Sequence, residues 1–409
     1  MTSEHPFAPL YSASPRPRAR PRVRVSKAAM RWFVTAFCVR ILATLLIHLY
    51  SIHAGYGGLY PLASGADDIT YWNLSQDIYN GVPIAYVSNS YPFVLAAFFH
   101  FTGGPNLLVG QLLNAVVGAV SVGIGVLIVE ELARNQPSRK VRRRALAWSG
   151  ALLTFYPSLL WYSTQLVKDP ILVMLGMAAL YFQICFLRRA NPQWIAGWLL
   201  ATGGLYFFRP YAAIALALSL FFFVVRFNRR WLIPSLILVG VVPLGLGMGP
   251  FGWRYIAPLL DTSNISAFRE QQYSVGGSSA GITINYSNPL TFLATYSYSF
   301  ATAMFGPFPW QISAAGQIIA LPEAIGMWLL SPLWVGALRD LWRQRKNRDR
   351  DGHRDLLLML FSLVLVGSVA LFSDNIGANT RLRLLPWSAF LLLASLRLAN
   401  KRFRFNLRF

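Results

Sequence analysis

The chain has 409 residues, of which 55% are hydrophobic, 14% aromatic and 13% charged. Soluble proteins carry roughly 25% charged residues, so this composition excludes an ordinary soluble enzyme, and the apolar content excludes a disordered or collagen-like chain. The formal net charge of +22 would indicate nucleic-acid binding in a soluble protein. In a membrane protein, the same excess reports which loops face the cytoplasm, and no nucleic-acid partner is expected.

The first 31 residues are rich in proline and arginine, with the run PRPRARPRVRVSK at 15–27. Such a segment buries too little apolar surface to fold, so we predict a disordered, basic cytoplasmic tail over 1–31 that contacts anionic membrane lipids. The basic stretch is too long for a cleavable signal peptide, and no small-residue cleavage site follows it. A second basic tail is expected at 400–409.

Ten apolar runs follow the tail, and most of them approach the roughly 20 residues that a helix needs to cross a bilayer. They predict an all-α polytopic membrane protein with about ten transmembrane helices, within a range of roughly eight to twelve. In chain order the predicted spans are 32–50, 107–129, 145–162, 170–187, 194–208, 211–225, 231–248, 318–338, 356–372 and 384–399.

Two long segments separate these runs, at 51–106 and 249–317, and both are rich in aromatic residues, Gly, Asn and Ser. We expect a transmembrane module over 32–248 whose first loop, 51–106, carries the site, then an extracytoplasmic loop over 249–317 and C-terminal helices over 318–399. Within the first loop, YPFVLAAFFHF at 91–101 is too short to span comfortably and predicts an amphipathic, interfacial or re-entrant helix.

The positively charged residues are concentrated in every second segment between the predicted helices. Six segments hold 30 of the 37 Lys and Arg residues: 1–31, 134–144, 188–189, 226–230, 339–354 and 397–409. Basic segments at every second gap are what the positive-inside rule predicts for one fixed topology. We therefore predict a plasma-membrane or inner-membrane protein with both termini in the cytoplasm and its site on the extracytoplasmic face.

The first candidate site motif is GADDITYWNLSQDIYNG at 65–81, which holds Asp67, Asp68 and Tyr71. A carboxylate just outside the membrane can accept a proton from an acceptor hydroxyl and so act as a general base. An acid before a helix can equally cap its free N–H groups. Spacing alone leaves both interpretations open.

The second motif is TQLVKDPILVML at 164–175, in which Asp169 precedes a helix-opening proline and Lys168 precedes Asp169. Asp169 can cap this helix or join the first-loop acids, and Lys168 can anchor the chain at the interface or bind an anion. The remaining candidates are Arg209, Arg381 and Arg383, since arginine binds phosphate through two donors and stays charged. Headgroup anchoring and pairing with the acids are the alternatives.

The turn GPFPWQ at 306–311 places Trp310 where it can line a sugar pocket or anchor a loop. The three histidines on this side lack metal-ligand spacing, and the two cysteines lie inside apolar runs. No metal site is therefore predicted, no cofactor is required, and a divalent ion is not excluded.

Taken in order, these motifs resemble the GT-C fold membrane glycosyltransferases, in particular the family 39 group with protein O-mannosyltransferases and aminoarabinose transferases. The resemblance rests on the Asp67-Asp68 pair with Tyr71 and the segment 91–133, on KDP at 168–170, on FFRPYAA at 207–213 and on RLRLLPWSAFLLLA at 381–394. One departure concerns the first-loop pair, which is usually Asp-Glu in the family. Which of Asp67 and Asp68 is the base is therefore open.

The resemblance implies a sugar donor linked to polyprenyl phosphate and an acceptor hydroxyl on a lipid, glycan or protein. It implies Asp67 as the general base of an inverting displacement, with Asp68 orienting it or binding acceptor and Asp169 positioning a substrate. It also implies that Arg209, Arg381, Arg383 and Lys168 bind the donor phosphate, and Tyr71 and Trp310 are the expected substrate contacts.

Two other functions remain open on the sequence. A polysaccharide polymerase or ligase would use the same lipid-phosphate chemistry with a larger extracytoplasmic loop. A lipid or solute transporter would show an internal repeat and broken helices at the bilayer midplane, and neither is evident in the sequence.

Overall fold

The structure is a computed structural model that describes residues 26–59, 67–84, 87, 89–189, 191–227, 262–273, 280–312, 318, 320–343 and 354–400. Every regular element in these ranges is a helix, as the apolar runs predict. Of the tail predicted at 1–31, residues 1–25 lie outside the described residues, whereas residues 27–31 form the first turn of a helix and not a disordered segment. The span predicted at 231–248 lies outside the described residues, as does the tail predicted at 400–409 except for Asn400, which ends the last helix.

The helices agree with the predicted spans wherever the chain is described, although the helix predicted at 145–162 is divided at Pro157. The α-helices are α1 (Lys27–His53), α3 (Asp67–Tyr79), α4 (Tyr91–Thr102), α5 (Leu107–Leu132), α6 (Arg139–Phe155), α7 (Pro157–Tyr162), α8 (Asp169–Arg188), α9 (Pro192–Phe208), α10 (Pro210–Phe227), α13 (Thr262–Tyr273), α14 (Pro289–Phe305), α16 (Leu321–Arg343), α17 (Asp355–Phe372), α18 (Ile376–Leu382) and α19 (Leu384–Asn400). The short helix predicted at 91–101 is present as α4.

The segment 249–317, expected as a loop, contains two helices in its described part, α13 and α14. The reason for the difference is local. Asn288 caps α14 by accepting a hydrogen bond from the Thr291 N–H at 2.9 Å, and Pro289 opens the first turn. Because α14 carries several Ser, Thr and Tyr side chains, its composition conceals a regular helix from an analysis based on apolar runs.

Five described helices are long and apolar enough to cross a membrane: α1, α5 together with the 3-10 turn Ala133–Asn135 that continues it, α8, the α16 segment Leu321–Arg339 and α17. Helices α18 and α19 form a further candidate that is bent by 55°. The protein is a multi-pass membrane protein. The total of about ten spans stays a prediction, since several other described helices are shorter.

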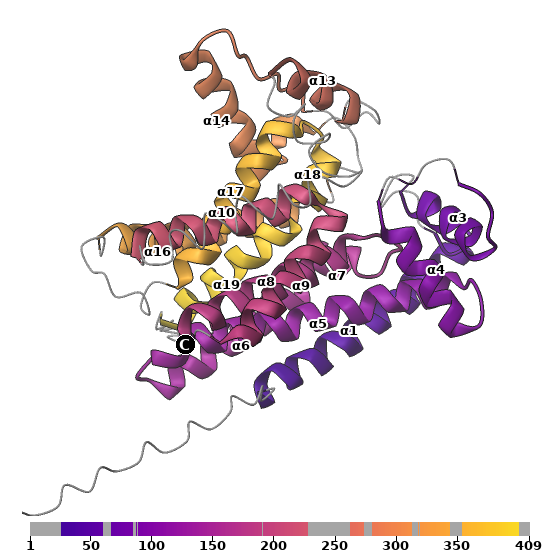
Figure 1. The fold of residues 1–409 in the computed structure, drawn as a ribbon, viewed down its shortest axis with the longest axis horizontal. Helices are drawn as coiled ribbons and strands as arrows, with labels where there is room; N and C mark the ends of the chain where they lie inside the picture. Colours follow the sequence, from indigo (N-terminus) through magenta and orange to yellow (C-terminus); the bar gives the residue numbers. More distant parts are fainter. Residues whose placement is uncertain are drawn as a thin grey trace, which may run out of the picture.

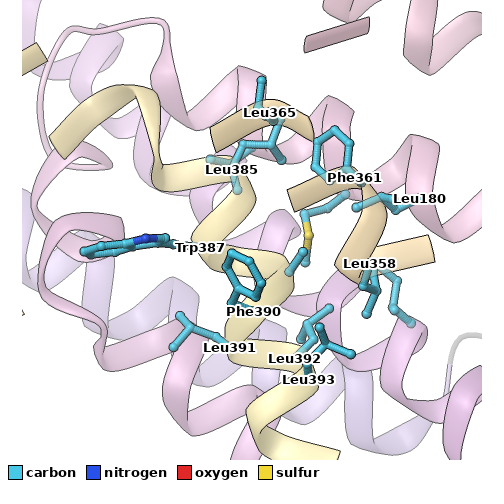
Figure 2. Packing of buried hydrophobic residues seen from close by; sticks show 14 of the residues in the cluster. Leu180, Leu358, Phe361, Leu365, Leu385, Trp387, Phe390, Leu391, Leu392 and Leu393 are labelled. Carbon is cyan, nitrogen blue, oxygen red and sulfur yellow. The ribbon is translucent and has the colours of Figure 1, made fainter. Parts of the chain in front are cut away.

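Helix α19 lies at the centre of the helical bundle (Figure 1). Residues 384–395 are all buried, although they include both apolar and hydroxyl side chains. Figure 2 shows Trp387 and Phe390 of α19 among leucines of the same helix, with Leu358 and Phe361 of α17 and Leu180 of α8 on the facing side. A helix that is covered all round sets the positions of the helices packed against it.

The bundle has two chemically different ends, which α5 connects. At the C-terminal end of α5, Glu130 pairs with Arg142 at 2.8 Å and Glu131 pairs with Arg188 at 2.6 Å. At its N-terminal end lie α3 and α4, the helices of the first long loop (Figure 1). The basic segments 134–144 and 188–189 therefore meet at the end opposite to the candidate acids, as the predicted topology requires.

Arg269 links helix α13 to the bundle. The guanidinium of Arg269 donates to the Ala370 carbonyl at 2.7 Å and to the Ile282 carbonyl at 3.0 Å, and it also donates to Ser299 Oγ at 3.1 Å. Because Ala370 lies near the C-terminus of α17, where carbonyls lack helical partners, this arginine satisfies the helix end while it fixes α13 beside it.

The contact between α1 and α6 depends on Gly150, since a Cβ atom there would lie 2.1 Å from the Trp32 ring. We predict that Gly150→Ala lowers the free energy of unfolding by about 2 kcal/mol because the rigid indole has to move. Gly203→Ala in α9, where a new Cβ meets nothing within 4 Å, is the control. Thermal unfolding in detergent checks both, and equal melting temperatures for the two variants would contradict the prediction.

Candidate functional site

The first turn of α3 directs its two acids differently. The Asp67 side chain is 47% exposed, whereas Asp68 is 1% exposed and accepts a hydrogen bond from the Ile69 N–H at 2.9 Å. Successive helical residues are rotated by about 100°, so one acid of the pair faces outward when the other faces the core. Asp67 is therefore the acid of this pair that a substrate can reach.

Helix α3 is held in place by aromatic packing on its buried face. Tyr71 meets Tyr91 of α4 edge to face with ring centroids 5.3 Å apart, and the Asn89 amide donates to the Tyr71 hydroxyl at 3.0 Å. Burial, and then the nearby Asp67 carboxylate, raise the pKa of Tyr71 to about 12, so this phenol stays protonated. With 3% of its surface exposed, Tyr71 supports α3 in this structure. Its expected role as a substrate contact stays a prediction.

The segment that leads into α8 is held by Asn114 of α5. The Asn114 amide nitrogen donates to the carbonyls of Gln165 and Val167 at 2.6 and 2.7 Å. These carbonyls lie just before Lys168 and Asp169. One buried amide therefore sets the point at which α8 begins and with it the position of the Asp169 carboxylate.

Asp169 is 1% exposed and receives hydrogen bonds from two arginines. Arg209, between α9 and α10, donates to Asp169 Oδ1 at 2.9 Å, and Arg381 of α18 donates to Asp169 Oδ2 at 3.0 and 2.9 Å. A capping role would turn the carboxylate towards N–H groups of α8, but α8 has no side-chain cap. The side chain of Asp169 binds the two arginines.

Arg381 also joins the two candidate acids. Its third donor, Nη1, binds Asp67 Oδ2, so one guanidinium contacts a carboxylate from α3 and another from α8. The neighbouring Thr380 Oγ1 lies 3.0 Å from the Tyr162 hydroxyl, which fixes α18 against α7. Arg381 therefore stands between an exposed acid and a buried acid.

Lys168 lies at the edge of this acid–arginine cluster, which we define as Asp67, Asp169, Arg209 and Arg381. Burial, and then the charge of Arg209, lower the pKa of Lys168 to about 8. Counted with Lys168, the group holds three cations and two carboxylates. It therefore has a net positive charge whenever Lys168 is protonated, and a positive site of this kind favours an anionic ligand.

Two expected site residues lie elsewhere. Arg383 is 1% exposed, donates to the Gly306 carbonyl and lies 3.9 Å above the Trp387 ring, so it faces away from the carboxylates that Arg381 binds. Trp310 is 71% exposed and stacks on Phe308 at 4.8 Å. No interaction described for either residue involves the acid–arginine cluster, and their roles in binding substrate stay predictions.

Several residues of the site were not among the candidates from the sequence. Asn89 holds Tyr71 of α3, Asn114 holds the segment before Asp169, and Tyr162 and Thr380 hold α18, each through hydrogen bonds. One signal was present, because an asparagine inside the apolar run of α5 must find hydrogen-bond partners in the bundle. For metals, no group of three or more His, Cys, Asp or Glu side chains with suitable geometry occurs among the described residues.

Comparison with known proteins identifies a solved structure of similar fold. No family model matches the sequence, and no curated protein matches it. The structure of ArnT from Cupriavidus metallidurans bound to undecaprenyl phosphate is similar, with a TM-score of 0.55 at 15% sequence identity. The match covers 91% of this chain and 60% of the ArnT chain, so the present chain corresponds to less than two thirds of ArnT.

The chain has an ArnT-like GT-C fold. This result confirms the fold expected from the short motifs at 65–225 and 381–394. At 15% identity the similarity concerns the fold, and the chemistry of the site has to be argued from the residues of this chain.

The role of Asn114 can be tested directly. We predict that Asn114→Leu lowers the free energy of unfolding by about 3 kcal/mol, because two buried carbonyls lose their donor. Gln183→Leu in α8 is a matched control, since its buried amide atoms have no partner among the described residues and an apolar side chain replaces them without loss. Chemical denaturation in detergent measures both, and an Asn114 variant as stable as the Gln183 variant would contradict the assignment.

Proposed function

We propose that the protein is an integral membrane glycosyltransferase. It moves a sugar from a polyprenyl-phosphate donor to an acceptor hydroxyl at the extracytoplasmic face. The observation that carries the proposal is the acid–arginine cluster, in which the half-exposed Asp67 lies beside partly buried arginines. The ArnT-like fold supports it, since the ArnT structure contains undecaprenyl phosphate.

Asp67 is the general base of the proposed reaction. The acceptor oxygen attacks the anomeric carbon as the bond between that carbon and the phosphate oxygen breaks. The hydroxyl proton goes to the Asp67 carboxylate, and the electron pair of the broken bond leaves with the polyprenyl phosphate. One displacement inverts the anomeric configuration and requires a single base. Asp68, which is buried and engaged with the Ile69 N–H, supports α3 in this scheme.

The leaving phosphate gains negative charge in the transition state, so cations fixed near it accelerate the reaction. Arg209, Arg381 and Lys168 supply this charge in the proposal. Asp169 has a positioning role in the proposal, because both of its oxygens accept hydrogen bonds from arginines. Its function is to hold the two guanidinium groups within reach of one phosphate.

In this scheme, the contact between Arg381 and Asp67 determines the order in which donor and acceptor bind. While Arg381 binds Asp67, a guanidinium N–H occupies Asp67 Oδ2, an oxygen that the acceptor proton would otherwise reach. A phosphate that binds Arg381 competes for the same donor and releases Asp67. In this scheme the donor binds first and activates the base that the acceptor requires.

The proposed base can be tested with purified protein and a polyprenyl-phosphate sugar. Asp67→Asn is expected to lower the transfer rate by about 100-fold or more, since the amide cannot take the proton. Asp77→Asn, on the same helix and outside the cluster, is the control and is expected to transfer at the wild-type rate. Full activity of Asp67→Asn, or transfer only from oligosaccharide-pyrophosphate lipids, would contradict the proposal.

The lowered pKa of Lys168 predicts that donor binding depends on pH. A lysine with a pKa of about 8 carries its charge below pH 8 and loses it as the pH rises. If the charge binds the phosphate, the KM for the donor rises by about fivefold between pH 8 and pH 9, while the acceptor KM stays constant. Lys168→Arg keeps the charge throughout and is expected to give a flat donor KM over this range. A wild-type KM that does not change with pH would remove Lys168 from the donor site.

A further inference from the structure

Arg40 is a buried cation that the proposed reaction does not use. It lies in the middle of α1, is 1% exposed and stands in a helix apolar enough to cross a membrane. A charge in that position is costly, so side chains of this kind face partners or water inside the bundle. No carboxylate in the described part of the chain forms an ion pair with Arg40.

One contact of Arg40 has a clear origin. Its Nη2 donates to the Leu153 carbonyl at 3.1 Å. In a continuous helix this carbonyl would accept from the N–H of residue 157, but that residue is Pro157, which has no N–H and starts α7. Arg40 therefore satisfies the carbonyl that the break between α6 and α7 leaves without a helical partner.

The path of the side chain depends on Gly118 of α5. A Cβ atom at this position would lie 2.9 Å from Arg40 Nε and 2.8 Å from Ser163 Cβ. Because glycine has no Cβ, the guanidinium passes across α5 and reaches the interior of the bundle. There its other two nitrogens, Nε and Nη1, have no hydrogen-bond partner among the described residues.

The guanidinium borders a cavity of about 20 Å³ between α1, α5, α7, α8 and α19. Its polar lining residues are Arg40, Ser121, Tyr162, Ser163, Asp169 and Ser388. A cavity needs roughly 10 to 15 Å³ of such space, together with two to four polar partners, to hold a water molecule. This cavity satisfies both conditions.

The hydrogen-bond capacity of the lining identifies the ligand. The three serine hydroxyls donate to helix carbonyls, Ser121 to Val117 at 3.0 Å, Ser163 to Leu160 at 2.7 Å and Ser388 to Leu384 at 2.7 Å. Their remaining lone pairs can only accept, whereas the vacant groups of Arg40 can only donate. An anion would find no donors on the serine side, and a cation would be repelled by Arg40. Water both accepts and donates.

We propose that this cavity is a binding site for one internal water molecule, which accepts from Arg40 and donates to Ser388 and one other serine. The water couples α1 to α19 close to the first turn of α8, the helix that begins at Asp169. Arg40 is then a positioning residue that links α1 to α19 beside α8, the helix that begins with Asp169. The inference concerns the bundle and does not depend on which reaction the cluster performs.

A double-mutant cycle on the full chain in lipid nanodiscs tests the coupling. Arg40 and Ser388 make no direct hydrogen bond in the described structure, so a bridging water is the polar link through which their effects would couple. With the water, Arg40→Met or Ser388→Ala already breaks the bridge. Ser388→Ala is expected to lower the melting temperature by roughly 2 °C, and the double variant by clearly less than the sum of the two single losses.

The control cycle pairs Arg40→Met with Ser395→Ala. Ser395 is buried on the same helix, donates to Leu392 at 2.6 Å and does not line the cavity. Additive losses are expected for this control. Additive losses in the Ser388 cycle as well would overturn the proposal.

Where Arg40→Met does not fold, the pair Ser121→Ala and Ser388→Ala replaces it, since both hydroxyls line the cavity from different helices. A cryo-electron-microscopy map of the wild type that resolves ordered water gives a second measurement. Density between Arg40 and Ser388 supports the site. A cavity without density in a map that shows other internal waters overturns it.

Discussion

The ion pairs of Asp169 are the interaction on which the rest of the site depends. A carboxylate that is 1% exposed at the start of an apolar helix would be very costly if it stood alone. Arg209 and Arg381 offset that cost, and each reaches Asp169 from a different part of the chain. Removing the carboxylate would leave two guanidinium groups close together with Asp67 as the one remaining carboxylate of the cluster, so the site exists as a unit.

The positions of these charged side chains are fixed by neutral groups. Asn114 fixes the start of α8, and the contact of Tyr162 with Thr380 fixes α18, whose C-terminal end carries Arg381. Ionic attraction is weakly directional, whereas hydrogen bonds of an amide or a phenol have defined geometry. The charged groups therefore supply the electrostatic field of the site, and the neutral ones decide where that field lies.

Much of the fold could be predicted from the sequence, because the helix positions depend on apolar runs and on local signals such as Asn106 before α5 and Ser138 before α6. The acids and Arg381 could be predicted as well, since charged groups are rare on that side. Arg383 could not be separated from Arg381 in this way. The two residues are two positions apart at a bend between α18 and α19, and the direction of each side chain depends on tertiary packing. The partners of Asn114 and Arg40 could not be predicted for a related reason, because they are carbonyls far away in the chain.

The length of α5 has a consequence for where the site lies in the bilayer. Asn114, which holds the segment before Asp169, and Glu130, which pairs with Arg142, are 16 residues apart on one helix, or about 24 Å. The hydrocarbon core of a bilayer is about 30 Å thick. If the Glu130 end stays at the cytoplasmic water boundary, the acid–arginine cluster lies close to the opposite edge of the hydrocarbon. At this depth the phosphate of a lipid already resides, so such a ligand would reach the cluster by lateral diffusion, without leaving the membrane.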